Sequence, residues 1–186
     1  MYRLYWGRRT ASQAAMAVLE EAGAAYDAIE IDVAAGAHEA PAYRRIHPLG
    51  LVPALELPDG RVVFESAGMA MFLADRHPEA ELAPAPDALD RAVYNQWLFY
   101  LADTLYPGYG RWYRPGRFST DPADAGRIRD RARVMLTEQW EVVDGALAGR
   151  PWLVGDTCTT ADIYLGMVFG WDPEPALLSA RCPDVA

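Results

Sequence analysis

One stretch, residues 47–78, constrains the fold of this chain more than any other. It contains two short apolar runs, Ala54–Leu57 and Arg61–Phe64, separated by Pro-Asp-Gly at residues 58–60. Because Asp-Gly between apolar runs is a strong signal for a tight turn, the two runs are predicted to pair as an antiparallel hairpin. Any fold proposed for the chain must therefore include this hairpin.

A helix is predicted directly after the hairpin, since Met69, Phe72 and Leu73 recur at helical spacing. Ser66 stands where an N-cap hydroxyl is expected. The amide groups of the first helical turn have no partner within the helix, so this end of the helix is suited to an anion.

Val52-Pro53 comes just before the first hairpin strand. Proline has no N–H for a central ladder, and the cis form of an X-Pro bond costs only about 0.5–1 kcal/mol. A cis bond here would turn the N–H and C=O of Val52 outward, where an extended peptide can pair with them. Together with an acid at Glu65 and the helix end at Ser66, this edge fits a small peptide that carries an amine and carboxylates.

The residues before the hairpin complete an α/β domain. The pattern predicts a strand at Tyr2–Trp6, a helix at Ser12–Glu21, a second strand at Tyr26–Val33 and an irregular helical stretch from Gly36 to Arg45. A strand-helix-strand unit makes a parallel pair, whereas the hairpin is antiparallel, so the sheet is expected to be mixed. This is a thioredoxin-like arrangement of four strands.

An all-helical domain is expected to follow. Residues 78–87 carry three prolines and read as a linker between an N-terminal domain, 1–77, and a C-terminal domain, 88–186. The C-terminal domain shows no convincing strand signal and three helical segments: Ala88–Leu105, Asp121–Leu147 and Thr159–Phe169. The middle helix is predicted to turn these residues inward: Ile128, Met135, Leu136, Val142, Val143 and Leu147.

Thr159 and Asp162 have the spacing of a capping box at the start of the last predicted helix. In such a box the threonine side chain and the acid each bond to a backbone amide of the helix start. We therefore expect Asp162 to be structural and not a catalytic acid.

The bulk composition excludes several classes of protein. The net charge is −9 and the pI is about 4.8. Nucleic acids and anionic membrane surfaces bind basic proteins, so neither is expected as a partner of this chain. The two cysteines, Cys158 and Cys182, are too few for a disulfide framework or a metal cage, so no metal is expected. No signal peptide and no apolar run long enough to span a membrane is recognisable, so we expect a cytoplasmic protein.

Two motifs together resemble the soluble glutathione S-transferase family. Residues 48–55 read Pro-Leu-Gly-Leu-Val-Pro-Ala-Leu, and residues 65–69 read Glu-Ser-Ala-Gly-Met. The common forms in the family are Asn-Pro-x-Gly-x-Val-Pro-x-Leu and Glu-Ser-x-x-Ile, in the same order and at a similar separation. Residues 151–163 resemble a second signature of the family, Leu-x-Gly-Asp-x-x-Ser/Thr-x-Ala-Asp-Ile. The likeness covers nearly the whole chain. The family usually continues through a further helix and tail, so either this protein is shorter than its relatives or the sequence stops before the protein ends.

The resemblance implies a set of glutathione contacts. Val52 would pair through its backbone with the cysteine of glutathione, and Pro53 would be the cis proline that permits this. Glu65 would meet the γ-glutamyl amine, and Ser66 with its helix end the γ-glutamyl carboxylate. Leu51 replaces a common Lys or Gln, which removes a polar contact. His47 replaces a common asparagine and is expected to be solvated or at a helix end.

The same resemblance implies where the thiol is activated. A free thiol has a pKa of about 8.5, so the enzyme must stabilise the thiolate with a hydrogen bond at the start of the first helix. Ala11 stands where some subgroups carry a catalytic cysteine, and bacterial members that read Ser-Arg-Ser-x-Arg-Val place two serines at Thr10 and Ser12. We predict Thr10 first and Ser12 second as the donor, with Arg9 able to add positive charge or to take the place of a hydroxyl donor. Tyr5 is the other candidate, although strand alternation is expected to bury it; helix capping alone remains an alternative for the two hydroxyls.

The electrophile is expected to bind near an aromatic segment of the helical domain, although plain packing between domains explains these residues equally well. The residues concerned are Tyr106, Tyr109, Trp112 and Tyr113. The resemblance thus implies a homodimeric detoxification enzyme that transfers glutathione to a small electrophile. The alternatives are a non-catalytic scaffold that keeps the transferase fold, or a glutathione-dependent peroxidase or isomerase.

Overall fold

The computed structural model describes residues 1–185, and the chain divides into two compact units. The first unit comprises Met1–Arg91, and the second begins at Ala92. The assignment of residues 78–87 as a linker stays a prediction. Each unit has its own buried core and is described separately below.

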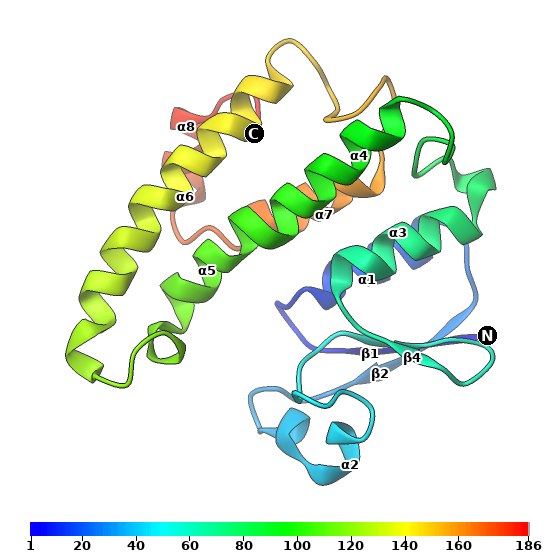
Figure 1. Ribbon diagram of the computed structural model, residues 1–186, viewed down its shortest axis with the longest axis horizontal. Coiled ribbons are helices and arrows are strands. Elements are labelled where there is room, and N and C mark those ends of the chain that lie inside the picture. The colour runs from blue at the N-terminus through cyan, green and yellow to red at the C-terminus, as the bar shows by residue number, and fades with distance from the viewer. Residues whose placement is uncertain (186) are drawn as a thin grey trace. The chain divides into compact units, whose positions relative to one another are not determined.

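The first unit is built on a mixed sheet of four strands in the order β2-β1-β3-β4. Strand β1 pairs in parallel with β2, whereas β3 is antiparallel to both β1 and β4. The predicted mixed sheet and thioredoxin-like domain are confirmed (Figure 1). The strands are β1 (Tyr2–Trp6), β2 (Tyr26–Glu30), β3 (Ala54–Glu56) and β4 (Val62–Val63).

Helices cover both faces of this sheet. Two long helices lie on one face and a short helix lies on the other (Figure 1). The long helices pack over Leu4 and Leu55, which are completely buried. The opposite face carries a smaller cluster in which Tyr5 and Tyr43 meet edge to face. The helices are α1 (Ser12–Glu21), α2 (Pro41–Arg44) and α3 (Ser66–Arg76), with 3₁₀ turns at Ala37–Glu39 and Pro78–Ala80.

Three predicted strands are shorter than expected. Strand β2 ends at Glu30 and not at Val33, because β1 offers no partner beyond Trp6 and the Asp32 side chain accepts from the Ala35 amide in a turn. The hairpin strands lose one or two residues at their ends, because Leu57 and Arg61 already belong to the turn.

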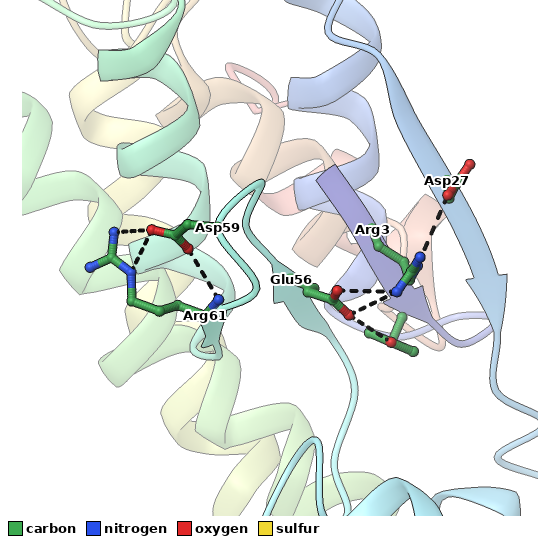
Figure 2. Close-up of polar contacts among 6 residues, drawn as sticks. Arg3, Asp27, Glu56, Asp59 and Arg61 are labelled. Atoms are coloured by element: carbon green, nitrogen blue, oxygen red, sulfur yellow. Dashed lines mark hydrogen bonds and ion pairs between the residues drawn. The ribbon is translucent and has the colours of Figure 1, made fainter. Parts of the chain in front are cut away.

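A network of ion pairs and hydrogen bonds joins neighbouring strands of the sheet. The Arg3 guanidinium lies between Asp27 and Glu56, at 3.9 Å and 3.1 Å (Figure 2). Glu56 also accepts from the Tyr5 hydroxyl at 3.0 Å. At the hairpin turn, Asp59 pairs with Arg61 at 2.6 Å (Figure 2). The Arg3 side chain thus links three adjacent strands, β2, β1 and β3.

The second unit is helical throughout the residues that the structure describes. No strand occurs between Ala92 and Val185, which confirms the predicted all-helical region. Its helices are α4 (Asp90–Phe99), α5 (Tyr106–Tyr113), α6 (Ala125–Leu147), α7 (Thr160–Phe169) and α8 (Pro175–Arg181), with 3₁₀ turns at Pro115–Arg117 and Pro122–Asp124. Helix α8 lies outside the predicted helical segments.

A π-helical turn at Tyr100–Leu105 joins α4 to α5. The prediction ended the first helix at Leu105 because Pro107, Gly108 and Gly110 follow, and this was wrong: the helical path continues to Tyr113. A proline inside an α-helix lacks an N–H and collides with the carbonyl four residues earlier. The π turn changes the hydrogen-bond register just before Pro107, so the chain passes the proline without leaving the helix.

Helix α6 buries a single stripe of side chains. Leu136, Val143 and Leu147 are buried as predicted, and Ala132 and Trp140 complete the stripe. Val142 was expected to face inward but is 53% exposed. Neighbouring residues on a helix point about 100° apart, so Val142 cannot share the stripe with Val143.

Helix α5 approaches α6 closely at Gly108. A Cβ at this position would lie 2.6 Å from Cδ2 and 2.8 Å from Cγ of Leu136. A glycine is therefore needed here for the two helices to pack at their observed distance.

Candidate functional site

Three segments that carry the predicted site residues meet at one edge of the sheet. Strands β1 and β4 both run antiparallel to β3, so their C-terminal ends lie at the edge where β3 begins. The segment after β1 contains Thr10 and Ser12, the segment before β3 contains Val52 and the segment after β4 contains Glu65. The topology therefore places the predicted thiol donors and glutathione contacts within one unit and at one edge.

Gly7 joins two of these segments directly. A Cβ on Gly7 would lie 3.1 Å from Cγ2 of Val52 and 2.8 Å from Cγ2 of Val33. The backbone of Gly7 also contacts both hydroxyl side chains, as described next. No pattern in the sequence marked Gly7 as a site residue, because it reads only as the end of a strand.

Thr10 and Ser12 form a compact hydroxyl pair. Their oxygens lie 2.8 Å apart, Thr10 Oγ1 donates to the Gly7 carbonyl at 2.8 Å, and the Gly7 amide donates to Ser12 Oγ at 3.2 Å. Ser12 is 1% exposed, whereas Thr10 is half-buried. The N-cap of α1 is Ala11, without a side-chain cap, although Thr10 Oγ1 accepts from the Ser12 amide at 3.3 Å. The two hydroxyls thus bond to each other and to the backbone of Gly7 as well as to the start of α1.

Tyr5 is buried, as the alternation of the strand predicts, with 8% of its surface exposed. Its hydroxyl donates to Glu56 at 3.0 Å. Burial, followed by this hydrogen bond, raises the pKa of Tyr5. Its proton is thus held by Glu56 within the sheet, which argues against Tyr5 as the thiol donor.

Arg9 is exposed and has a left-handed backbone, with φ of 52°. The preceding arginine, Arg8, pairs with Glu30 at 2.7 Å. Of the two adjacent guanidinium groups, the one on Arg8 is therefore held against β2, and Arg9 remains the predicted source of positive charge beside Thr10.

The Val52–Pro53 peptide bond is cis, as predicted. The ladder between β1 and β3 begins at Ala54, so Val52 lies outside it. Tyr43 donates its hydroxyl to the carbonyl of Leu51 at 2.7 Å and so anchors the backbone just before Val52. Sequence reasoning missed Tyr43, because the short irregular helix that carries it shows no periodicity.

Glu65 rather than Ser66 is the N-cap of α3, so the predicted role of Ser66 as cap was wrong. Glu65 has φ of 75° and ψ of 101°, and Ser66 is the first helical residue. The unusual backbone of Glu65 turns the chain one residue earlier than a serine cap would. Glu65 therefore directly precedes the amide end of α3 in the chain, an arrangement that suits a ligand with both an anionic and a cationic group.

His47 is 4% exposed and not solvated, contrary to expectation. Its Nδ1 accepts from the Leu49 amide at 3.3 Å, and its ring lies against Phe64 with centroids 4.8 Å apart. Burial lowers the pKa of His47, and the nearby Glu65 partly opposes this. His47 thus supports the loop beside Glu65 as a neutral ring.

Three of the four predicted electrophile residues lie in one aromatic cluster within the second unit. Tyr109 donates to Asp172 and accepts from Trp140, both at 2.8 Å, and is 2% exposed. Tyr113 donates to the carbonyl of Trp171, and the ring of Tyr106 packs on Trp171. Trp112 lies apart from these contacts, beneath the Arg133 guanidinium. The hydroxyl of Tyr109 therefore makes its hydrogen bonds within this unit.

A cavity of about 170 Å³ lies in the second unit between α6 and α8. Of the predicted electrophile residues, only Trp112 lines it, together with Arg133, Trp140, Asp172, Glu174 and Cys182 among others. This hollow is not the pocket that the sequence predicted.

The thiol of Cys182 at this cavity is expected to resist alkylation. Cys182 has no exposed surface, and burial, followed by the charges of Asp144 and Glu141, raises its pKa, so little thiolate is present near neutral pH. Cys158 is half-buried. With maleimide at pH 7.5 and mass spectrometry of peptides, we expect Cys158 to be labelled first and Cys182 only after denaturation. Equal labelling rates in the native protein would contradict this.

Two further features of the described residues bear on the class of protein. Within residues 1–185, no group of three or more His, Cys, Asp or Glu side chains is arranged to hold a metal ion. None of the helices in that range is both long and apolar enough to cross a membrane.

Comparison with known proteins decides the family. The family described as "Glutathione S-transferase, N-terminal domain" matches residues 10–76. The protein "Glutathione S-transferase GST-4.5" of Xanthomonas campestris is 32% identical over 139 residues, which cover 75% of this chain and 68% of that protein. This chain belongs to the glutathione S-transferase family. "Glutathione S-transferase GstA" of Escherichia coli O157:H7 is 28% identical over 170 residues, 91% of this chain and 81% of that protein.

Solved transferase structures share the fold. The crystal structure of a glutathione transferase homologue from Sulfitobacter, with bound glutathione, superposes with a TM-score of 0.90 at 26% identity. The alignment covers 100% of this chain and 88% of that one. A second transferase, from a sphingomonad and complexed with glutathione, has a TM-score of 0.83 at 28% identity and is covered over 88% of its length. The glutathione S-transferase fold thus extends over both units.

Proposed function

We propose that this transferase activates the thiol of glutathione for attack on a small electrophile. The observation that carries the proposal is the convergence of Thr10, Val52 and Glu65 at one sheet edge in a chain of this family. A nucleophilic thiolate, an extended peptide backbone and a zwitterionic γ-glutamyl group each find a suitable partner there. Glutathione is the co-substrate, and no metal is required for this chemistry.

The γ-glutamyl and cysteine residues of glutathione are each assigned contacts. Glu65 binds the γ-glutamyl amine, and Ser66 with the amide end of α3 binds the γ-glutamyl carboxylate. The backbone of Val52, next to Pro53, pairs with the cysteine residue of the tripeptide. Leu51 has no polar side chain to offer, and its backbone carbonyl accepts from the Tyr43 hydroxyl. The affinity for glutathione is therefore expected to be modest.

The chemistry lies in the sulfur. A thiol with a pKa of about 8.5 is mostly protonated at neutral pH, and a donor that bonds better to S⁻ than to SH shifts this balance. Thr10 supplies that hydrogen bond, and the amide end of α1 adds a favourable dipole. Arg9 adds positive charge to the same region, while the thiol proton leaves to water.

The remaining assignments concern the surroundings of the reaction. We propose that the aromatic segment of the second unit binds the electrophile through Tyr106, Trp112 and Tyr113, with the buried Tyr109 supporting it from within, and that the enzyme is a cytoplasmic homodimer with a role in detoxification. The thiol form of Cys158 and Cys182 is compatible with a reducing compartment.

Two measurements test the proposal. Calorimetry should show binding of glutathione, and 1-chloro-2,4-dinitrobenzene should be conjugated faster with the protein than without it. Binding without turnover of this or any other electrophile would favour the alternative, a non-catalytic glutathione-binding protein. If glutathione does not bind at all, both the proposed transferase and the non-catalytic glutathione-binding alternative are overturned.

Replacing Glu65 by glutamine is expected to weaken glutathione binding about tenfold. The amide keeps the shape of the side chain but loses the charge-assisted bond to the γ-glutamyl amine, which corresponds to about 1.4 kcal/mol. The dissociation constant is measured by calorimetry at pH 7.

A matched control is available for this substitution. Like Glu65, Glu81 is exposed and has a positive φ, which is 54°. Glu81→Gln should therefore leave glutathione affinity unchanged. An equal effect of the two substitutions would show that general electrostatics, and not a contact at Glu65, sets the affinity.

A further inference from the structure

The two hydroxyls beside Gly7 have different surroundings. Thr10 Oγ1 has three polar neighbours: the Gly7 carbonyl at 2.8 Å, the Ser12 amide at 3.3 Å and Ser12 Oγ at 2.8 Å. Ser12 Oγ lies between Thr10 Oγ1 and the amide of Gly7, which donates to it at 3.2 Å. Each hydroxyl has a single proton to place among these neighbours.

Only one placement of the two protons satisfies all four contacts. The Gly7 carbonyl can only accept, so the bond to it requires the proton of Thr10. Thr10 then has no proton left for Ser12, so Ser12 must be the donor in the contact between the two oxygens. The amides of Gly7 and Ser12 complete the arrangement as donors to the serine and threonine oxygens.

We infer that Ser12 is a positioning residue that acts through Thr10, in a chain of hydrogen bonds from the Gly7 amide to Ser12, to Thr10 and on to the glutathione sulfur. This inference rests on the proposed function. Ser12 is too deeply buried to reach a ligand, with 1% of its surface exposed, whereas Thr10 is half-buried. Thr10 is therefore the group that contacts the sulfur.

The chain of donors explains how Thr10 changes partner. When glutathione binds and its thiol proton leaves to water, the O–H of Thr10 turns from the Gly7 carbonyl to the thiolate sulfur. Ser12 continues to donate to Thr10 Oγ1, as does its amide. Two donors on the threonine oxygen polarise its O–H and make it a stronger donor, because hydrogen bonds in a chain reinforce one another. Both hydroxyls keep their protons throughout.

A double-mutant cycle tests this order. The variants are Thr10→Val, which keeps the shape of threonine, Ser12→Ala, and both together. The readout is the pKa of the bound glutathione thiol, titrated by thiolate absorbance near 240 nm at saturating glutathione. We expect the bound-thiol pKa to rise by about one unit in Thr10→Val and by about half a unit in Ser12→Ala. The double variant should match Thr10→Val alone, because Ser12 acts only through the threonine hydroxyl.

Two controls separate this role from a structural one. Thr10→Ser retains the hydroxyl and should retain the bound-thiol pKa. Tyr5→Phe removes a hydroxyl that is held by Glu56 and should also leave it unchanged. If Ser12 served only the packing of α1, Ser12→Ala would alter thermal stability but not the thiol pKa.

The outcomes distinguish the inference from the proposed function. If Ser12→Ala shifts the thiol pKa as much in the Thr10→Val background as in the parent, Ser12 acts independently and the inference is overturned. The same follows if Thr10→Val binds glutathione with an unchanged thiol pKa. Failure of the unmodified protein to bind glutathione in calorimetry would instead overturn the proposed function on which the inference rests.

Discussion

Replacing Trp140 by alanine is expected to lower the free energy of unfolding by about 4 kcal/mol, the largest effect of any substitution considered for this protein. The Trp140 side chain is 1% exposed and its ring lies edge to face against Phe169. Its Nε1 donates to the hydroxyl of Tyr109, which in turn donates to Asp172. Alanine would leave a cavity and remove one member of this buried network. Urea denaturation followed by circular dichroism measures the loss.

Two comparisons give this prediction its meaning. Trp140→Phe retains a ring but not the N–H and should cost about half as much, since part of the volume stays filled. Trp152→Ala removes a half-buried tryptophan from a loop and should cost less than either. Equal losses for Trp140 and Trp152 would mean that neither the deeper burial of Trp140 nor its contacts set the stability of this unit.

The second large effect is expected at Asp162. Its carboxylate accepts from the amides of Thr159 and Leu153, each at 2.8 Å, and from the Thr159 hydroxyl at 3.0 Å. Thr159 and Leu153 are buried, so their amides would lose their acceptor without gaining full access to water. Asp162→Ala is therefore expected to lower the free energy of unfolding by about 3 kcal/mol, more than the loss of an ordinary cap.

Matched substitutions separate the hydrogen bonds from the charge. Asp156 is an exposed aspartate in the preceding loop, and Asp156→Ala should change stability by less than about 0.5 kcal/mol. Asp162→Asn keeps one acceptor oxygen and should fall between the two alanine variants. If Asp162→Ala instead abolished turnover at unchanged stability, the structural role assigned to this acid would be refuted.

The elements that local rules determine were predicted well. Strand β1 and helix α1 have the predicted bounds, since Gly7 ends the strand and Gly23 follows the helix. The hairpin follows from Asp-Gly, and the capping box at Thr159 and Asp162 is present. In each case the deciding interaction lies within a few residues of sequence.

Predictions failed where a distant partner or a backbone torsion decides. Strand β2 stops at Glu30 because its neighbour stops, which the residues of β2 do not encode. The burial of His47 depends on Phe64, which reaches it from beyond the hairpin. The cap at Glu65 depends on a positive φ that glutamate rarely adopts, so a serine in the next position was the more natural choice.

Motifs could mark the candidate site residues in the sequence, but they could not predict the hydrogen bonds between these residues. Motifs located Thr10, Ser12, Val52 and Glu65 along the sequence, and the strand directions bring their segments to one edge. Which hydroxyl donates to which depends on the carbonyl and amide of Gly7, two backbone atoms that no side-chain pattern reveals. The roles of the site residues stay predictions until glutathione binding is measured.

The π turn at Tyr100–Leu105 makes the length of this segment as important as its composition. Such a turn holds one residue more than an α-helix needs over the same distance. Regular α-helical winding of the same number of residues would rotate everything beyond the segment by about 100°. Tyr109 would then point away from Trp140 and Asp172, so relatives that keep these three side chains together should have either the π turn or a regular helix that is one residue shorter.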